Sequence, residues 1–170
     1  MSIASIVTAK VGKNGSRRQY REALVETLGN YQGEEYDDPG SFGEQSGPVE
    51  VGEMYFFNYN ATKPERLTYY DQYPVSYIIH IDKSGFIGAN MHYLAPKLRE
   101  AVATGLINSG DGITVPDRTI HRYQFEGVQG NMMKVPESEM VDVSMLPIEE
   151  FIKVETGNRF PSYRVWRGEK

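Results

Sequence analysis

Residues 85–99 read GFIGANMHYLAPKLR, and this stretch sets the expectations for the fold. Its first half is apolar and contains Gly85 and Gly88, which suit a turn and a sharply curved strand. Upstream, residues 73–81 read YPVSYIIHI, a second β-prone run that a short KSG turn joins to the first. Pro96 then marks a helix start, because proline is well tolerated at the first helical position. The two runs therefore predict a β-hairpin that leads into a helix.

The N-terminal region carries a clear helix signal of its own. Ser16 and Gln19 are spaced as a capping box, in which each side chain bonds the backbone of the other residue. Apolar residues then recur every three or four positions, and Gly29 stands where a C-terminal cap is expected. These features predict an amphipathic helix over residues 17–28.

Periodicity places the remaining elements. The helix that begins at Pro96 is expected to end at Gly105, with Leu98, Ala101 and Val102 facing the core. Alternating or aromatic runs predict strands at 54–59, 119–125 and 140–146, one helical turn at 147–153, and an edge strand in the tail that carries Trp166.

The composition favours one strand-rich domain with long connections. The 170 residues include 17 glycines, 9 prolines and 12 tyrosines, which are typical of turns and strands rather than of a helical bundle. Residues 34–53 contain seven acidic side chains and neither lysine nor arginine, and their glycines and prolines break any regular element. We expect a linker there. Its EEYDDPG segment could clamp a hard cation such as Ca²⁺, but it lacks the spacing of an EF-hand loop, so no metal site is predicted.

The sequence carries little catalytic chemistry. His80, His92 and His121 lie far apart and show no metal-binding spacing. The chain has no cysteine, no phosphate-binding loop and no nucleophile elbow. We therefore predict a protein without enzymatic activity, and we predict neither a metal nor a cofactor.

Asp71 and His92 form the one candidate acid–base pair, and a hydrolase that uses them is an alternative hypothesis. In the structural interpretation, Asp71 caps a turn by accepting backbone N–H bonds, and Pro74 fixes the entry into the next strand. His92 then closes the end of a barrel, between the end of the strand and the start of the helix. We favour the structural interpretation.

The net charge of −5 gives the chain no general attraction for nucleic acid, so any DNA contact must be local. No segment approaches 18 apolar residues and the first residues lack the features of a signal peptide, so we expect no membrane partner and no export. The arginines of the first helix form either a contact surface or a solvated basic face. The candidate contacts to DNA or to a partner chain are Arg17, Arg18, Arg21, Lys97, Arg99 and Trp166.

Several blocks of the chain resemble the DNA end protector family of T-even-like tailed phages. The blocks are VGEMYFFNYNA, YYDQYPV, GFIGANMHYLAPKLR and VDVSMLPIEEFIK, followed by RVW. The match is good over residues 51–102 and looser over residues 141–166. By position, the family motif falls on Tyr69, Tyr70, Asp71, Pro74, Gly85, Gly88, Asn90, His92, Tyr93, Pro96 and Arg99.

The resemblance implies a virion protein that shields the ends of packaged DNA and catalyses no reaction. Because the net charge is negative and a fold does not fix a function, we expect instead a non-enzymatic structural component of the head–tail neck or of the tail and baseplate. A DNA end protector is the alternative. The expected partners are neighbouring virion proteins in a symmetric oligomeric assembly, with DNA ends in the alternative. The expected location is the virion, after synthesis in the host cytoplasm.

The expected fold class is α+β. It consists of a small SH3-like β-barrel with an N-terminal amphipathic helix, a helix after the third strand, and extended arms. Three regions follow from this interpretation: an arm, helix and acidic linker at 1–47, a barrel domain with an inserted helix at 48–154, and a C-terminal arm at 155–170.

Overall fold

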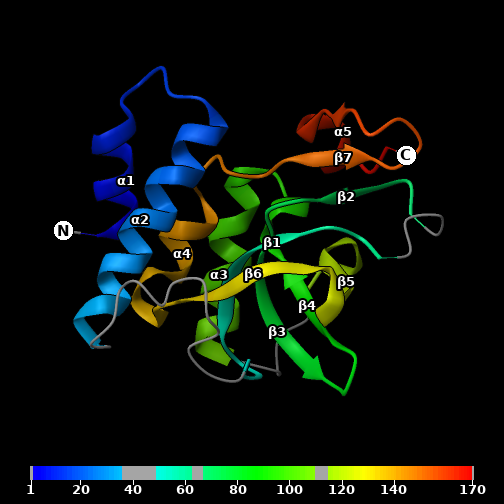
Figure 1. The fold of residues 1–170 in the computed structure, drawn as a ribbon, viewed down its shortest axis with the longest axis horizontal. Helices are drawn as coiled ribbons and strands as arrows, with labels where there is room; N and C mark the ends of the chain where they lie inside the picture. Colours follow the sequence, from blue (N-terminus) through cyan, green and yellow to red (C-terminus); the bar gives the residue numbers. More distant parts are fainter. Residues whose placement is uncertain (1, 36–48, 63–66, 110–114, 170) are drawn as a thin grey trace.

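The computed structural model describes residues 2–35, 49–62, 67–109 and 115–169. The chain forms a mixed α+β fold, in which helices gather at one end and antiparallel strands at the other (Figure 1). The two termini lie at opposite ends of the molecule (Figure 1). This confirms the predicted α+β class. Most of the linker predicted between residues 34 and 53 lies outside the described residues.

Two helices open the chain. Helix α1 spans Ile3–Val11 and is capped by the Ser2 hydroxyl, whose oxygen accepts from the amide of Ser5 at 3.0 Å. Helix α2 spans Arg17–Glu35, which extends the predicted helix by seven residues at its C-terminal end. The predicted capping box is present, because Ser16 and Gln19 exchange hydrogen bonds of 2.8 and 3.2 Å.

The main sheet has five antiparallel strands: β1 (Met54–Tyr59), β3 (Val75–Ile81), β4 (Gly85–Asn90), β5 (Ile120–Gln124) and β6 (Val128–Val135). Their order across the sheet is β5-β4-β3-β1-β6. Strands β3 and β4 form the predicted hairpin, with Ser76 opposite Asn90. Within the described residues, β5 and β6 are not hydrogen-bonded to each other, so the sheet is not a closed barrel.

Strands β1 and β4 are buried on both faces, which explains why they read as nearly continuous apolar runs. Successive residues of β1 point to opposite faces, so Phe56 and Phe57 belong to different cores. One core packs the sheet against α1, α2, α3 and α4, and the other is an aromatic cluster enclosed by the curved sheet. That cluster contains Tyr55, Phe57, Tyr59, Ile78, Phe86, Tyr123 and Met132.

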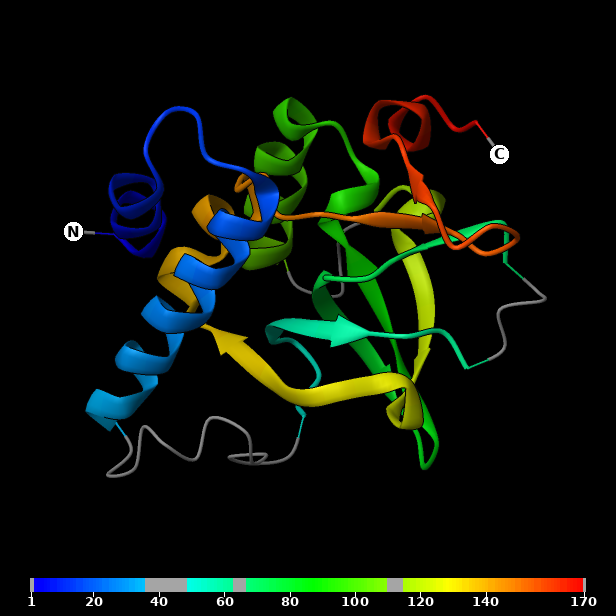
Figure 2. The same ribbon diagram turned by 45° about the horizontal axis from the view of Figure 1, so that its top comes forward.

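A second, three-stranded sheet pairs β2 (Tyr69–Asp71), β7 (Phe151–Lys153) and β8 (Arg159–Phe160), in the order β2-β7-β8. Figure 2 shows β7 crossing above the main sheet, between the helical end and the C-terminal helix. Asp71 is paired with Phe151 in this sheet. The small sheet thus joins the segment before the hairpin to the C-terminal quarter of the chain.

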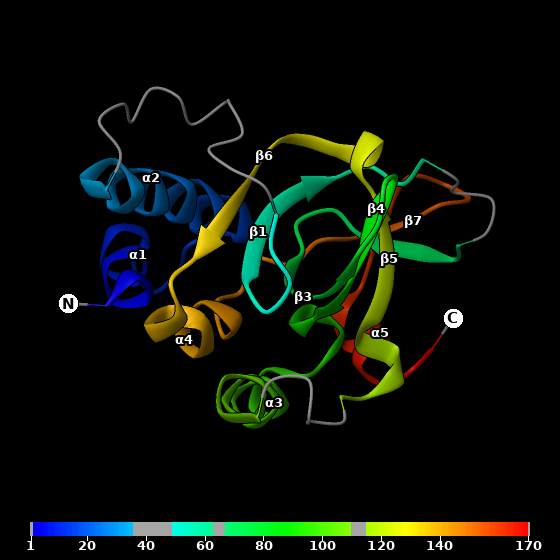
Figure 3. The ribbon, with the colours of Figure 1, turned by 90° about the horizontal axis from the view of Figure 1, so that it is seen from below.

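Three more helices cover the sheet: α3 (Pro96–Ser109), α4 (Met140–Ser144) and α5 (Ser162–Trp166). Viewed from below, α1, α2 and α4 lie together at one end, and α3 is seen nearly end-on beside α4 (Figure 3). Short 3₁₀ turns at Met91–Tyr93, Asp117–Thr119, Phe125–Gly127 and Glu137–Glu139 make the connections.

Several predicted elements are wrong. Residues 140–146 contain helix α4 and not a strand, and residues 147–153 contain strand β7 and not a helical turn. The tail forms the helix α5 where an edge strand was predicted, and β6 was not predicted at all. Helix α3 continues past Gly105 to Ser109, and its buried residues are Arg99, Ala103 and Leu106 in place of the predicted set.

The terminal segments are integral parts of the core, and the described residues do not form free arms. Ile3, Val7, Leu24 and Leu28 are at most 2 % exposed and pack in the same cluster as the main sheet. At the other end, Val165 is buried beside Phe151 in a third cluster. These contacts bury both ends of the described chain, in two separate hydrophobic clusters.

Candidate functional site

Three of the motif residues, Asp71, Asn90 and His92, meet in a buried polar centre at the junction of the two sheets. His92 Nδ1 lies 2.7 Å from Asp71 Oδ2, and Asn90 Nδ2 donates to the same oxygen at 2.9 Å. Because a carboxylate can only accept, His92 carries its proton on Nδ1. The other carboxylate oxygen accepts from the amides of Tyr73 at 3.0 Å and Glu150 at 3.3 Å. Asp71 therefore has four donors.

The local fold positions each member of this centre. Asp71 ends β2, and its bond to Tyr73 two residues later makes the turn that was predicted for it. Asn90 ends β4 and caps the following 3₁₀ turn, because its side-chain oxygen accepts from the amide of His92 at 3.0 Å. Its amide nitrogen also donates to the Tyr123 hydroxyl at 3.3 Å, which links the centre to β5.

Burial and hydrogen bonding act in opposite directions on Asp71. Burial raises the pKa of this carboxyl, but the pairing with His92 and the hydrogen bonds from Asn90 and Tyr73 outweigh it and leave the pKa below its ordinary value. Burial raises the pKa of Tyr93 and Tyr123 well above the ordinary tyrosine value, and the nearby Asp71 charge adds to the effect. Asp71 is thus a buried carboxylate whose charge the structure stabilises.

Arg99 forms a second buried group beside this centre. Its guanidinium donates to the carbonyls of Leu94 at 2.8 Å and Ser144 at 3.2 Å, and lies 3.5 Å from that of His92. Glu149 is the nearest carboxylate, with an oxygen 3.8 Å from the guanidinium. Burial lowers the pKa of Arg99, and the Glu149 charge opposes that change. Arg99 therefore joins α3 to three other segments.

Trp166 attaches the C-terminal helix to the same centre. Its indole Nε1 donates to the carbonyl of His92 at 2.9 Å, and its ring lies 5.5 Å from the Arg99 guanidinium. Tyr69 stacks on Phe160 with ring centroids 4.7 Å apart. The second motif tyrosine, Tyr70, packs edge-on against Tyr59 in the aromatic cluster. The motif tyrosines and Trp166 are packing residues.

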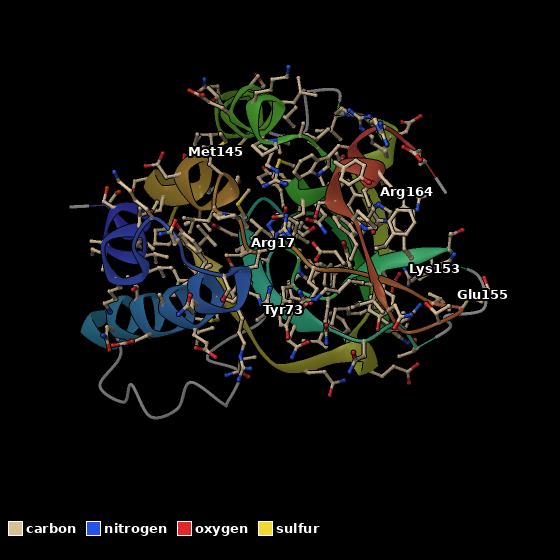
Figure 4. All side chains as sticks on the ribbon, turned by 90° about the horizontal axis from the view of Figure 1, so that it is seen from above. Arg17, Tyr73, Met145, Lys153, Glu155 and Arg164 are labelled. Atoms are coloured by element: carbon tan, nitrogen blue, oxygen red, sulfur yellow. The ribbon has the colours of Figure 1, made fainter. Side chains whose placement is uncertain are left out.

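Two arginines of α2 reach the small sheet through a pair of glutamates that sequence reasoning missed. Arg17 lies 3.5 Å from Glu149, and Arg21 lies 3.2 Å from Glu150. The Arg21 guanidinium also stacks over the Tyr73 ring at 4.1 Å. Figure 4 labels Arg17 and Tyr73 at the place where α2 meets the sheet. The only signal for the glutamates was an adjacent acidic pair after a proline, which nothing distinguishes from surface charge.

The motif glycines and prolines shape the backbone around the centre. A Cβ on Gly85 would lie 2.0 Å from the Tyr123 carbonyl oxygen, and one on Gly88 would lie 2.1 Å from the Ser76 hydroxyl. Both glycines therefore allow neighbouring strands to approach closely. Pro74 is buried before β3, and Pro96 opens α3 as predicted.

The polar centre is sealed from solvent. Asp71 is 1 % exposed, and His92 and Arg99 are fully buried. The second ring nitrogen of His92, Nε2, is buried and has no hydrogen-bond partner among the described residues. A general base must lie within hydrogen-bond reach of the proton it removes, and in the described part of the chain neither Asp71 nor His92 is exposed to a substrate.

The candidate contact residues do not form one basic face. Arg21 and Arg99 are buried and bonded inside the protein, so neither offers a charged surface to DNA or to a partner. Arg18 and Lys97 are exposed, and Arg17 is half-exposed beside Glu149. The side chain of Trp166 is bonded to the polar centre.

A groove separates α2 from the sheet, and we refer to it as the α2 groove. It has a volume of about 770 Å³ and is lined by residues of α2, β1 and β6 together with Tyr73, Glu150 and Arg159. A smaller groove of about 400 Å³ lies beside it and shares Arg18, Glu150 and Arg159. Sequence reasoning singled out Arg18 and Arg21 but not the groove, because β6 was not predicted.

No group of three or more acidic, histidine or cysteine side chains that could hold a metal ion occurs among the described residues. Among the helices in the described ranges, none has both the length and the apolar character needed to cross a bilayer. In comparisons with known proteins, no family model, no curated protein and no solved structure matches the chain.

Proposed function

We propose that this chain is a non-enzymatic structural protein of a tailed-phage virion, in the head–tail neck or in the tail and baseplate. The observation that carries the proposal is the burial of the motif residues that resemble the DNA end protector family. Asp71, Asn90 and His92 are at most 1 % exposed, and, apart from His92 Nε2, their side-chain polar atoms bond to each other, to the Tyr123 hydroxyl and to backbone groups. Residues placed in this way specify a fold and do not contact a substrate.

The network supports a mechanical role, because it connects segments far apart in the chain. His92 accepts from Trp166 of α5, and Asp71 accepts from the amide that precedes β7. Arg21 of α2 donates to the carbonyl of Ile148 at 3.3 Å. A block in which both terminal segments are fixed to the central sheet is suited to transmitting contacts between neighbouring subunits.

We also propose that the main sheet is an SH3-like barrel in its topology. Counted along the chain, its strands lie in the order fourth, third, second, first, fifth, and a 3₁₀ turn joins the fourth to the fifth. That turn bridges the two edges, since the amide of Asn60 donates to Gly127 at 2.8 Å and the amide of Gln124 donates to the Tyr59 hydroxyl at 3.1 Å. These bonds curve the sheet around the aromatic cluster.

Quantitative mass spectrometry of purified particles of the encoding phage tests the assembly role. The chain is expected in intact virions at a fixed integer copy number, as a component of a symmetric ring requires. Its absence from particles that contain the other neck and tail proteins would refute the role.

DNA end protection is tested separately on the purified chain, with linear and closed-circular duplexes across a salt series. Tight, salt-sensitive binding that prefers ends would replace the assembly proposal with the protector function. We expect no preference for ends, because Arg21 and Arg99 are engaged inside the protein.

A further inference from the structure

The α2 groove exists because β6 departs from regular pairing with β1. Phe56 lies opposite Met133 and Asn58 lies opposite Gln129, so one residue of β1 faces three residues of β6. Gly130, with φ of +74°, allows the extra residues to turn outward. Bulges of this kind re-aim side chains and are common beside binding sites.

The bulge leaves an unsatisfied acceptor at the groove. Asn58 lines the groove, and its side-chain oxygen is buried without a hydrogen-bond partner among the described residues. A buried acceptor without a donor costs about 1–3 kcal/mol. An N–H group of a ligand would remove that cost once the Asn58 amide turns toward the groove.

The remainder of the groove combines an apolar wall with a positive rim. Val25 of α2 is 36 % exposed, and the half-buried Tyr73 ring continues the apolar surface. Arg18 and Arg159 stand at the rim with 79 % of their side chains exposed, and each pairs through its Nε with a glutamate of the groove, Glu22 or Glu150. The lining contains three arginines and two glutamates, which leaves one positive charge on a chain whose net charge is −5.

We propose that the α2 groove binds an extended peptide segment of another protein, in which an acidic side chain neighbours an apolar one. A backbone N–H of the peptide donates to Asn58, the carboxylate pairs with Arg18 or Arg159, and the apolar side chain covers Val25. An arginine fork matches a carboxylate well, and extended peptides commonly bind through main-chain hydrogen bonds and side-chain pockets. The inference rests on the proposed assembly role only for the source of the peptide, a neighbouring virion protein.

A peptide fits the groove better than a nucleic acid does. The sugar–phosphate backbone has no N–H group for the Asn58 oxygen. The apolar surface formed by Val25 and Tyr73 gains nothing from a phosphate backbone, whereas it buries an apolar side chain.

A displayed library of random twelve-residue peptides, selected against the full chain, tests the proposal. We expect enrichment of sequences with an acidic residue next to a large apolar one. Binding of the strongest synthetic peptide, measured by fluorescence anisotropy, should fall at least tenfold in Arg159→Glu and in Val25→Asp. Lys97→Glu is the matched control, because Lys97 is exposed outside the groove lining, and it should leave binding unchanged. Thermal unfolding of each variant verifies that it is folded.

Three results would overturn the inference: no enriched pattern, enrichment of basic peptides, or binding that the groove variants do not change. A twenty-base-pair duplex that displaces the peptide and is itself weakened by Arg159→Glu would assign the groove to nucleic acid. Selection on the purified chain does not depend on where the chain resides. A failed selection would therefore leave the result of the particle measurement unaffected, and absence of the chain from particles would leave the result of the selection unaffected.

Discussion

Replacing Asp71 with alanine is the most informative perturbation of the buried centre. The substitution leaves four donors without their acceptor: His92 Nδ1, Asn90 Nδ2 and the amides of Tyr73 and Glu150. Removing one partner of a buried charged network costs about 3–5 kcal/mol. We take about 4 kcal/mol, and in a chain of this length each kcal/mol lowers the Tm by about 2–4 °C. The expected loss is about 12 °C.

The assay is thermal unfolding followed by circular dichroism, with urea unfolding as a second measure. Asp82→Ala is the matched control, because Asp82 accepts a similar number of bonds, from Ser84, Gly85 and Arg122, but on the surface. Its Tm should change much less. A loss below about 3 °C for Asp71→Ala would mean that the network contributes under about 1 kcal/mol, and it would refute the structural role assigned to the motif.

The pH dependence of the Tm of the wild type and of Asp71→Ala shows in which direction the charge of Asp71 changes stability. The pKa of Asp71 is lower in the folded protein than the ordinary value of 3.8, so the stability it contributes is present above pH 4 and is lost as the pH falls further. The Asp71→Ala variant lacks this pH-dependent contribution to stability. The difference in Tm between the wild type and Asp71→Ala should therefore narrow between pH 5 and pH 2. A constant difference would contradict the ionised state assigned to Asp71.

Three further substitutions follow from the contacts around the centre. Arg99→Met removes the donor to three buried carbonyls and one of the two arginines that face Glu149, so it should cost about 3–5 kcal/mol in urea unfolding, whereas the exposed Lys97→Met should cost little. Trp166→Phe removes the hydrogen bond to the His92 carbonyl and puts a smaller ring beside Arg99, so we expect a loss of about 1–2 kcal/mol and faster hydrogen exchange in α5 without a change in β3. Gly88→Ala places a methyl group 2.1 Å from the Ser76 hydroxyl and should destabilise the hairpin, and Ser76→Ala in the same chain should restore part of the loss; equal Tm values for the single and double variants would refute that contact.

The elements that sequence analysis predicted correctly are those in which local signals and tertiary structure agree. The Ser16–Gln19 capping box, the glycine-bounded hairpin and the proline at the start of α3 are each specified by a few adjacent residues. The turn role of Asp71 was predicted for the same reason, because its bond to Tyr73 spans only two residues.

The errors occur where one pattern fits two structures. The apolar residues Val141, Val143 and Met145 alternate as in a strand, yet Val143 is buried in a helix that packs on α1 and α3. Strand β6 was missed because its bulge around Gly130 interrupts the alternation. In both cases tertiary packing determines the secondary structure, and the local sequence does not indicate that packing.

The candidate site was predicted in part. The sequence singled out Asp71, Asn90 and His92 by their resemblance to a motif, and the structure brings them within hydrogen-bond distance of one another. It did not indicate that Glu149 would lie between Arg17 and Arg99, because those contacts join residues at least fifty positions apart. Ion pairs between residues so far apart in the chain depend on the topology of the fold, which the spacing of residues in the sequence does not specify.

The temperature dependence of assembly in phage that carry His92→Asn tests most directly whether the motif is structural or catalytic. Asparagine can still donate toward Asp71 but loses the ring packing, so the variant should be destabilised yet folded at low temperature. The account predicts normal incorporation into particles and normal infectivity at 20 °C, with loss of both at 42 °C. Loss of infectivity at both temperatures, with the folded variant present in the particles at normal copy number, would contradict it and would point to a chemical role for His92.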